Sequence, residues 1–193
     1  MKQTGIVRKL DDLGRIVIPK EIRRGLRIKE GSPMEIVLND KGDVVLNKYS
    51  MVESVKDYSN IFCMVISDVH ECGCFITDRD KIISFYGDNK KEYIGKELSD
   101  EIMSIIESKK DYIANVLDKT TIYPIYKEDK NTYYSELIVP IIVQGECEGV
   151  LGLINTTSSS AFDKCQISTA HVVVKFISKQ IDLWKNIRIY MVL

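Results

Sequence analysis

The segment spanning residues 4–27 places the strongest constraint on how this chain folds. Val7 and residues 16–18 are typical of β-strands, and residues 11–14 between them have the composition of a tight turn, with a glycine placed for a positive φ. Pro19 comes next, and proline is favoured where a helix begins because its missing N–H is not needed there. The segment therefore predicts a strand, a turn, a second strand and a short helix.

The predicted helix carries positive charge along one face. Lys20, Arg23, Arg24 and Arg27 are spaced by three, four and seven residues, so they lie on the same side, where like charges repel. Residues 1–50 contain 11 Lys and Arg against 7 Asp and Glu, whereas residues 51–193 contain 16 against 21. This asymmetry predicts a polyanion-binding N-terminal part and a separate body, with a chance fluctuation of charge as the alternative.

A second hairpin completes the N-terminal part. Residues 34–38 and 43–48 are predicted strands, joined by a turn at residues 39–42. A domain that ends near residue 50 buries little apolar surface, and it has no disulfide or metal-binding pattern to support it. We therefore expect residues 1–50 to fold as a dimer in which the hairpins of two chains share one core.

Three motifs in this region resemble the AbrB-type swapped-hairpin DNA-binding domain of bacterial transition-state regulators. They are TGIVR at residues 4–8, LGRIVIP at residues 13–19 and EIRR at residues 21–24. The resemblance implies that two chains interleave into a β-barrel and that the arginines of these motifs contact double-stranded DNA. The candidate DNA-binding residues are these arginines and the neighbouring cations: Arg8, Lys9, Arg15, Lys20, Arg23, Arg24 and Arg27.

A related branch of the same fold forms the DNA-binding part of antitoxins, which usually end in a disordered toxin-binding tail. An antitoxin-like interaction protein is therefore one alternative function. This chain continues instead into a segment with the apolar pattern of a second core.

That segment, residues 51–193, predicts a unit of α+β class. The pattern indicates an amphipathic helix over 51–68, a hairpin over 74–86, a helix in two pieces over 90–110, a short strand over 122–126, strands over 134–143 and 149–154, and a last helix after a capping box at 160–163. This order resembles a GAF domain, a ligand-sensing fold. The most similar segments are LIVPI at 137–141 and GVLGL at 149–153.

We therefore predict an AbrB-like domain at 1–50, the start of a connecting helix at 51–56, a GAF-like domain at 57–185 and a hydrophobic tail at 186–193. A head of this kind joined to such a body resembles AbrB-type sporulation regulators. The resemblance predicts a DNA-binding transcription regulator of sporulation-type gene expression. Its GAF-like domain would serve oligomerisation and the sensing of an unknown small molecule.

The last helix has two apolar lines. Ala170, Val173, Ile177, Ile181 and Trp184 follow steps of three or four residues, and Val172, Phe176 and Leu183 form the second line. A surface helix needs only one apolar stripe, so we expect this helix to contact a second subunit as well as its own sheet. The alternative is packing within one large domain. Together with the N-terminal dimer, the subunit contact predicts a homotetramer.

Other residues offer weaker candidates for chemistry. His70, Cys72 and Cys74 would share one face of a strand and could begin a zinc site, although a fourth ligand at the usual spacing is not visible. A metal-binding protein that uses the C-terminal domain is a second alternative, and cysteines that fill a small core are the simpler interpretation. The remaining cysteines have no base or motif beside them, so we expect neither an enzyme nor a cofactor.

Five scattered cysteines, an odd number, favour a reducing compartment over a disulfide framework. The first residues lack the apolar run of a signal peptide, and no window approaches the roughly 18 apolar residues that span a bilayer. We therefore expect a cytoplasmic protein with no membrane partner.

Overall fold

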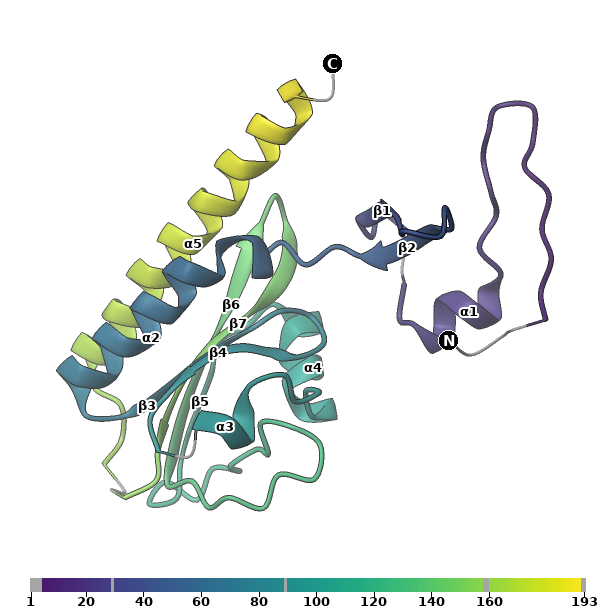
Figure 1. Ribbon diagram of the computed structural model, residues 1–193. Helices are drawn as coiled ribbons and strands as arrows, with labels where there is room; N and C mark the ends of the chain where they lie inside the picture. Colours follow the sequence, from purple (N-terminus) through teal and green to yellow (C-terminus); the bar gives the residue numbers. More distant parts are fainter. Residues whose placement is uncertain (1–4, 29, 89, 158–159, 192–193) are drawn as a thin grey trace. The chain divides into compact units, whose positions relative to one another are not determined.

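The computed structural model describes residues 5–28, 30–88, 90–157 and 160–191, the last stretch with side chains as far as Leu183. The chain divides into two compact units, Met1–Tyr49 and Ser50–Leu193. Both helices and strands occur in each unit, as the predicted α+β class requires (Figure 1).

The first unit contains one short helix and one regular hairpin. Helix α1 (Lys20–Gly25) follows Pro19, and strands β1 (Met34–Leu38) and β2 (Val44–Lys48) pair antiparallel from Met34 opposite Lys48 to Leu38 opposite Val44. The Asn39 side-chain oxygen accepts hydrogen bonds from the backbone N–H groups of Lys41 and Asp43, at 3.0 and 2.9 Å. These bonds close the turn, and the predicted second hairpin is confirmed.

The first predicted hairpin forms only at its tip. The backbone N–H of Asp11 donates to Arg15 (3.1 Å), and that of Gly14 donates to Asp11 (3.0 Å). Between Gly5 and Pro19, however, the structure contains no β-strand, so the strands predicted around Val7 and at residues 16–18 are absent from the single chain. A two-stranded ribbon is at best marginally stable without further strands beside it, which gives the physical reason. Thr4 lies outside the described residues.

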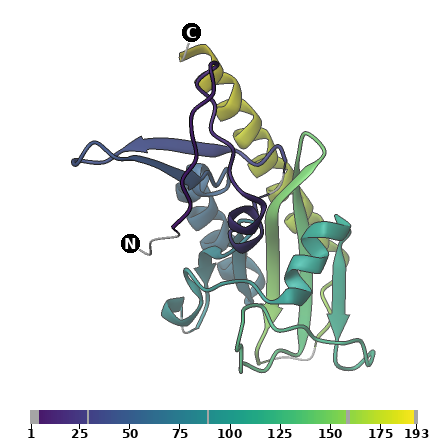
Figure 2. The same ribbon diagram turned by 90° about the vertical axis from the view of Figure 1, so that its right-hand side faces the viewer.

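The second unit is built on a five-stranded antiparallel sheet in the order β4-β3-β7-β6-β5. The strands are β3 (Gly73–Thr77), β4 (Ile82–Tyr86), β5 (Tyr112–Asn115), β6 (Ser135–Val143) and β7 (Glu146–Asn155). A short 3-10 turn (Glu53–Val55) leads into α2 (Lys56–His70), which packs beside α5 (Lys164–Met191) on one face. Helices α3 (Lys90–Tyr93) and α4 (Asp100–Ser108) cover the other face, and Figure 2 shows α4 in front of the sheet.

The core on the α3 and α4 side is mostly aliphatic and aromatic. Ile102, Ile105 and Ile106 form the buried face of α4, which begins where the hydroxyl of Ser99 accepts the backbone N–H of Ile102 at 3.2 Å. The rings of Phe85 and Tyr93 stack with centroids 3.8 Å apart. Strand β6 is buried along almost its whole length, as expected for a strand covered by helices on both sides.

Two sequence-based expectations about this unit are wrong. Residues 122–126 are not a strand; the edge strand is β5, which precedes them. The capping box of α5 also lies later than predicted: the Asp163 N–H donates to the Gln166 side chain and the Gln166 N–H to the Asp163 carboxylate, both at 2.9 Å. The carbonyl of Ser160 instead accepts the Ser135 hydroxyl at 3.0 Å, which ties this residue to the sheet.

The helix predicted in two pieces over 90–110 is confirmed as α3 and α4. The predicted hydrophobic tail is partly helical, since α5 continues to Met191, while residues 192–193 and the side chains from Trp184 onward lie outside the description. Within the described part of the chain, no helix combines the length and the apolar character that crossing a membrane requires.

Candidate nucleic-acid interface

Helix α1 ends in a defined hydrogen-bonded cap. The Ile28 N–H donates to the Arg23 carbonyl (2.8 Å) and the Arg27 N–H to the Arg24 carbonyl (3.1 Å), the pattern of a Schellman motif. Arg27 therefore occupies the position where the backbone turns left-handed, with a φ of 53°. Glycine usually fills this position because a side chain there is strained. Arg23 and Arg24 lie in the last turn, where positive charge is favourable.

The seven candidate DNA-binding residues are all exposed, and they belong to two local structures. The first is the hairpin-like loop of residues 5–19, which carries Arg8, Lys9 and Arg15. The second is α1 with its cap, which carries Lys20, Arg23, Arg24 and Arg27. Their assignment as DNA contacts stays a prediction.

One of these cations is already paired. The Arg15 guanidinium lies 2.7 Å from the Asp11 carboxylate, which also accepts the backbone N–H groups of Leu13 (3.1 Å) and Arg15 (2.7 Å). Hydrogen bonds from the Arg15 backbone and side chain lower the pKa of Asp11 below its ordinary value. The composition of residues 11–14 predicts the turn but not the ion pair between Asp11 and Arg15.

The first unit leaves much of its apolar surface uncovered. Large apolar side chains are exposed on the hairpin-like loop of residues 5–19, at the cap of α1 and on the β1–β2 hairpin: Ile6, Val7, Leu10, Leu13, Ile16, Val17, Leu26, Ile36, Val37, Leu38 and Val44. The residues around α1 also enclose an apolar hollow of about 240 Å³, lined in part by Ile16, Ile22 and Leu46. A stable monomer rarely exposes so many apolar side chains together.

The second unit has an exposed apolar strip on its two long helices. Tyr58, Ile61, Val65 and Val69 on α2 and Val172, Phe176 and Leu183 on α5 are all exposed. The strip is continuous, because the Phe176 ring makes edge contacts with Tyr58 and Phe62 at centroid distances of 6.0 and 5.1 Å. Ala170, Val173, Ile177 and Ile181, the first predicted line of α5, are buried on the inner side.

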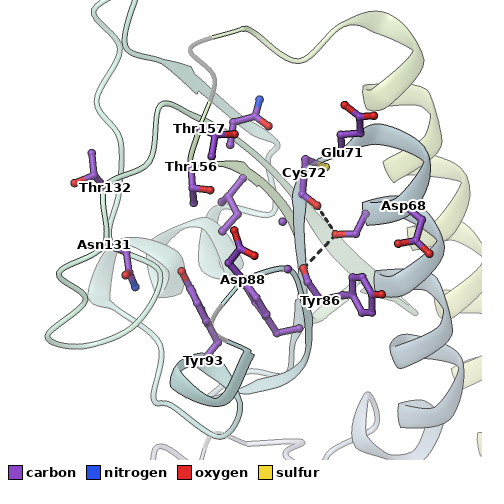
Figure 3. A pocket seen from close by; sticks show the side chains of 16 residues that line it. Asp68, Glu71, Cys72, Tyr86, Asp88, Tyr93, Asn131, Thr132, Thr156 and Thr157 are labelled. Carbon is purple, nitrogen blue, oxygen red and sulfur yellow. Dashed lines mark hydrogen bonds between the residues drawn. The ribbon is translucent and has the colours of Figure 1, made fainter.

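A polar hollow of about 400 Å³ lies at the carboxyl end of α2, between the end of β4, Tyr93 at the end of α3, and the end of β7 (Figure 3). We call it the rim hollow. Its lining includes three acidic residues, Asp68, Glu71 and Asp88, together with Tyr93 and Asn131. No sequence motif could have found it, since its residues come from separate segments of the chain.

The possible zinc ligands do not share a strand. His70 is the last residue of α2, and its ring lies 3.2 Å from the Thr169 hydroxyl on α5, whereas β3 begins only at Gly73. Burial raises the pKa of the Cys72 thiol to about 11 and also raises that of Cys74. Among the residues that the structure describes, no group of three or more His, Cys, Asp or Glu side chains is arranged to hold a metal ion.

Comparison with known proteins places the chain among regulators. Residues 54–182 match the family model described as stage V sporulation protein T C-terminal, transcription factor. The chain is also 31% identical over 182 residues to stage V sporulation protein T of Bacillus subtilis (strain 168), covering 94% of this chain and 99% of that protein. This chain belongs to the stage V sporulation protein T family. The predicted resemblance to AbrB-type sporulation regulators is confirmed.

Two further matches of this stage V sporulation protein T family member are to a transition state regulator and to an antitoxin family. The transition state regulatory protein AbrB of Bacillus subtilis (strain 168) is 34% identical over 105 residues, which cover 54% of this chain and 97% of that protein. Residues 7–54 match the family model described as MazE, a bacterial antitoxin. The family model describes a transcription factor.

The second unit of this family member has the predicted GAF-like fold. It is similar to the GAF domain of an Acinetobacter phosphoenolpyruvate-protein phosphotransferase, with a TM-score of 0.56, 17% identity and coverage of 68% of this chain and 88% of that one. The second GAF domain of DevS from Mycobacterium smegmatis is also similar, with a TM-score of 0.54, 12% identity and coverage of 68% and 96%. At these identities the likeness concerns the fold alone. Among the described residues of one chain β1 pairs with β2 alone, so a closed N-terminal barrel is not formed.

Proposed function

We propose that this transcription factor binds double-stranded DNA through the cations of its first unit, as a dimer, in the bacterial cytoplasm, where it regulates sporulation-type gene expression. The observation that carries this proposal is the exposure of all seven candidate cations on a unit that is similar to AbrB. Two copies of Arg8, Arg15, Arg23 and Arg24 would neutralise about 8 phosphates, which corresponds to a salt slope of roughly −7.

The DNA-binding proposal is tested by gel-shift measurements across a salt series, with an inverted-repeat probe and a scrambled probe. The double substitution R23A/R24A should weaken binding and make the salt slope less steep by about 3 to 4, because four phosphate contacts are lost per dimer. Lys41→Ala, which removes an exposed cation at the β1–β2 turn, is the matched control. Equal binding by the parent and R23A/R24A would refute the assignment of these residues.

The dimer proposal depends on the uncovered apolar side chains of the first unit. In an interleaved dimer the hairpins of a second copy would cover side chains such as Val17, Ile36 and Leu38 and fill the hollow beside α1. Folding and association would then be one event, so the unfolding midpoint should rise with protein concentration. A midpoint independent of concentration would argue for a monomeric first unit.

We further propose that the apolar strip on α2 and α5 joins two such dimers into a tetramer. The strip combines the second predicted apolar line of α5 with the exposed apolar side chains of α2. A second copy presents the same apolar surface, so two strips can pack against each other about a two-fold axis. Val65→Glu should convert a tetramer into a dimer in analytical ultracentrifugation, whereas Lys110→Glu, on an exposed residue outside the strip, should not. A dimeric parent protein would contradict this arrangement.

The match to MazE favours one second candidate, an antitoxin-like interaction protein. That match ends at residue 54, where this chain enters an ordered five-stranded unit, whereas the antitoxin model requires a tail that binds a toxin. Copurification of a small toxin with the tagged protein from its own host would support the antitoxin candidate.

The second unit would act as a sensor if a ligand favoured one packing of α2 over another.

A further inference from the structure

The first unit is hydrogen-bonded as far as its last residue. Strand β2 ends at Lys48, and the backbone N–H of the next residue, Tyr49, donates to the Pro33 carbonyl at 3.1 Å. Pro33 directly precedes β1, so this bond extends the β1–β2 hairpin by one residue on each side. The chain is therefore held by the first unit up to the boundary at Tyr49.

The second unit holds the chain from the very next residue. The Ser50 hydroxyl accepts the backbone N–H of Glu53 at 3.1 Å, as a capping residue does. Met51 and Val55 are buried, and Val52 is completely inaccessible to solvent. The 3-10 turn that follows packs against α2 and α5. The start of the second unit is thus an anchored segment.

An ion pair connects the 3-10 turn to the turn between β3 and β4. Lys81 Nζ lies 3.1 Å from Glu53 Oε2. The Asp78 carboxylate accepts the backbone N–H of Lys81 at 2.8 Å, which closes the β3–β4 turn. The Arg79 guanidinium donates to the Cys147 carbonyl at 2.8 Å and so ties the same turn to β7. Because both partners of the ion pair are partly exposed, it orients the 3-10 turn and adds little stability.

No residue between the two units is left for a flexible linker. Flexible linkers consist of several residues, usually rich in Gly and Ser, that neither domain holds. Residues 47–56 include neither Gly nor Pro, and Tyr49 and Ser50 are each hydrogen-bonded within their own unit. Since one residue spans at most about 3.6 Å, the units cannot separate, and they turn only about the backbone bonds that join Tyr49 to Ser50.

We propose that this junction makes the helical phase between two DNA sites a determinant of binding specificity. In the proposed tetramer, the second units join two dimers of the first unit, and each dimer binds one site. A junction without a linker would hold the two dimers at a set distance and rotation. This inference rests on the proposed DNA binding and tetramer, and it adds the arrangement of sites that they recognise.

The geometry of the duplex explains the expected dependence on phase. Two sites on the same face of the DNA can be bound by one tetramer, and binding at the first site then raises the effective concentration at the second. Sites displaced by half a helical turn, about 5 base pairs, face opposite sides of the duplex. To bind them together, the protein or the DNA must twist, which costs part of the affinity.

The test is gel-shift titration of the full-length protein with DNA that carries two copies of a site selected by the parent protein from a random-sequence pool. The distance between site centres increases by single base pairs over about two helical turns. The affinity should vary with a period of about 10.5 base pairs and by at least about 5-fold. Equal affinity at all spacings, with intact binding to a single-site probe, would overturn this inference alone. Absence of single-site binding would refute the DNA-binding proposal and this inference with it.

Insertions assign the phase dependence to the junction. A flexible segment of three Gly-Ser pairs between Tyr49 and Ser50 should reduce the variation to less than about 2-fold and leave single-site binding unchanged. The same segment between Asp118 and Lys119, in an exposed turn of the second unit, is the control and should keep the parent's variation. Equal variation in the parent and the junction variant would overturn the proposal. So would a smaller oligomer of the junction variant in analytical ultracentrifugation, because dissociation would then explain the loss.

Discussion

Arg15 Nε lies 2.7 Å from Oδ2 of Asp11, so one of the candidate DNA contacts is held by a carboxylate of its own turn. The same carboxylate accepts two backbone N–H groups through Oδ1. Both groups are solvent-exposed, so the ion pair adds little to stability. If Arg15 contacts DNA as proposed, Asp11 would compete with phosphate for its guanidinium.

Asp11→Asn should therefore strengthen DNA binding. Asparagine keeps an acceptor oxygen for the N–H groups of Leu13 and Arg15, so the turn is preserved, while the competing charge is lost. We expect about a 2- to 5-fold gain in affinity at low salt, measured by gel shift.

Asp12→Asn is the control for that gain, since it removes the same charge from the adjacent residue without breaking the Arg15 ion pair. A gain of equal size in both variants would mean that only the overall charge matters. A gain confined to Asp11→Asn would indicate that release of Arg15 is responsible.

Arg27 offers a way to separate DNA binding from stability. Its φ of 53° at the cap of α1 is strained for any residue with a side chain. Arg27→Gly should raise the free energy of unfolding by about 1 kcal/mol and should weaken DNA binding, because the cation is lost. Arg27→Ala should weaken DNA binding equally without the gain in stability. Thermal unfolding and gel shifts on both variants measure the two effects.

The parts of the fold that local pattern defines were predictable from sequence. The β1–β2 hairpin follows from its turn residues, and α4 follows from Ile102, Ile105 and Ile106. Strand β5 was missed because its four residues, Tyr112–Asn115, show no alternation, whereas residues 122–126 have the composition of a strand. That segment is instead held by hydrogen bonds from distant residues, such as that between the Tyr123 N–H and Glu136.

The two candidate sites also differ in how far they could be predicted from the sequence. The cations of the first unit lie within one run of about twenty residues, so the motif could be read directly. The strands expected around Val7 and Ile16 are absent, because a two-stranded ribbon with no further strand beside it is at best marginally stable, and no local pattern shows whether such a strand is present. The rim hollow depends on tertiary structure, because Asp68, Asp88 and Asn131 come together only when the sheet forms.

Gly152 on β7 lies opposite Phe75 on β3, and a Cβ atom there would be 2.1 Å from the ring. Gly152→Ala should therefore destabilise the second unit by about 1 to 3 kcal/mol, measured by urea unfolding. Because the obstacle is the ring, the double substitution F75L/G152A should recover part of the loss relative to the sum of the single effects. Additive effects would show that another contact is responsible.

Glu136 on β6 is fully buried. Its Oε2 accepts the Tyr123 N–H at 2.8 Å, and its Oε1 has no hydrogen-bond partner among the described residues. Burial disfavours the charged form and raises the pKa of this carboxyl group to about 8.

This buried carboxyl group should make the stability of the second unit fall as pH rises. Between about pH 4.5 and 8 the unfolded chain has released the Glu136 proton while the folded protein still holds it, so the free energy of unfolding decreases by at most about 1.4 kcal/mol per pH unit. Glu136→Gln keeps an acceptor for Tyr123 and carries no charge, so it should remove this contribution and be the more stable protein near pH 8. Urea unfolding at three pH values across this window measures how the free energy of unfolding depends on pH in the parent and in Glu136→Gln. Asp118→Asn is the surface control. Parallel slopes for the parent and Glu136→Gln would mean that another group titrates.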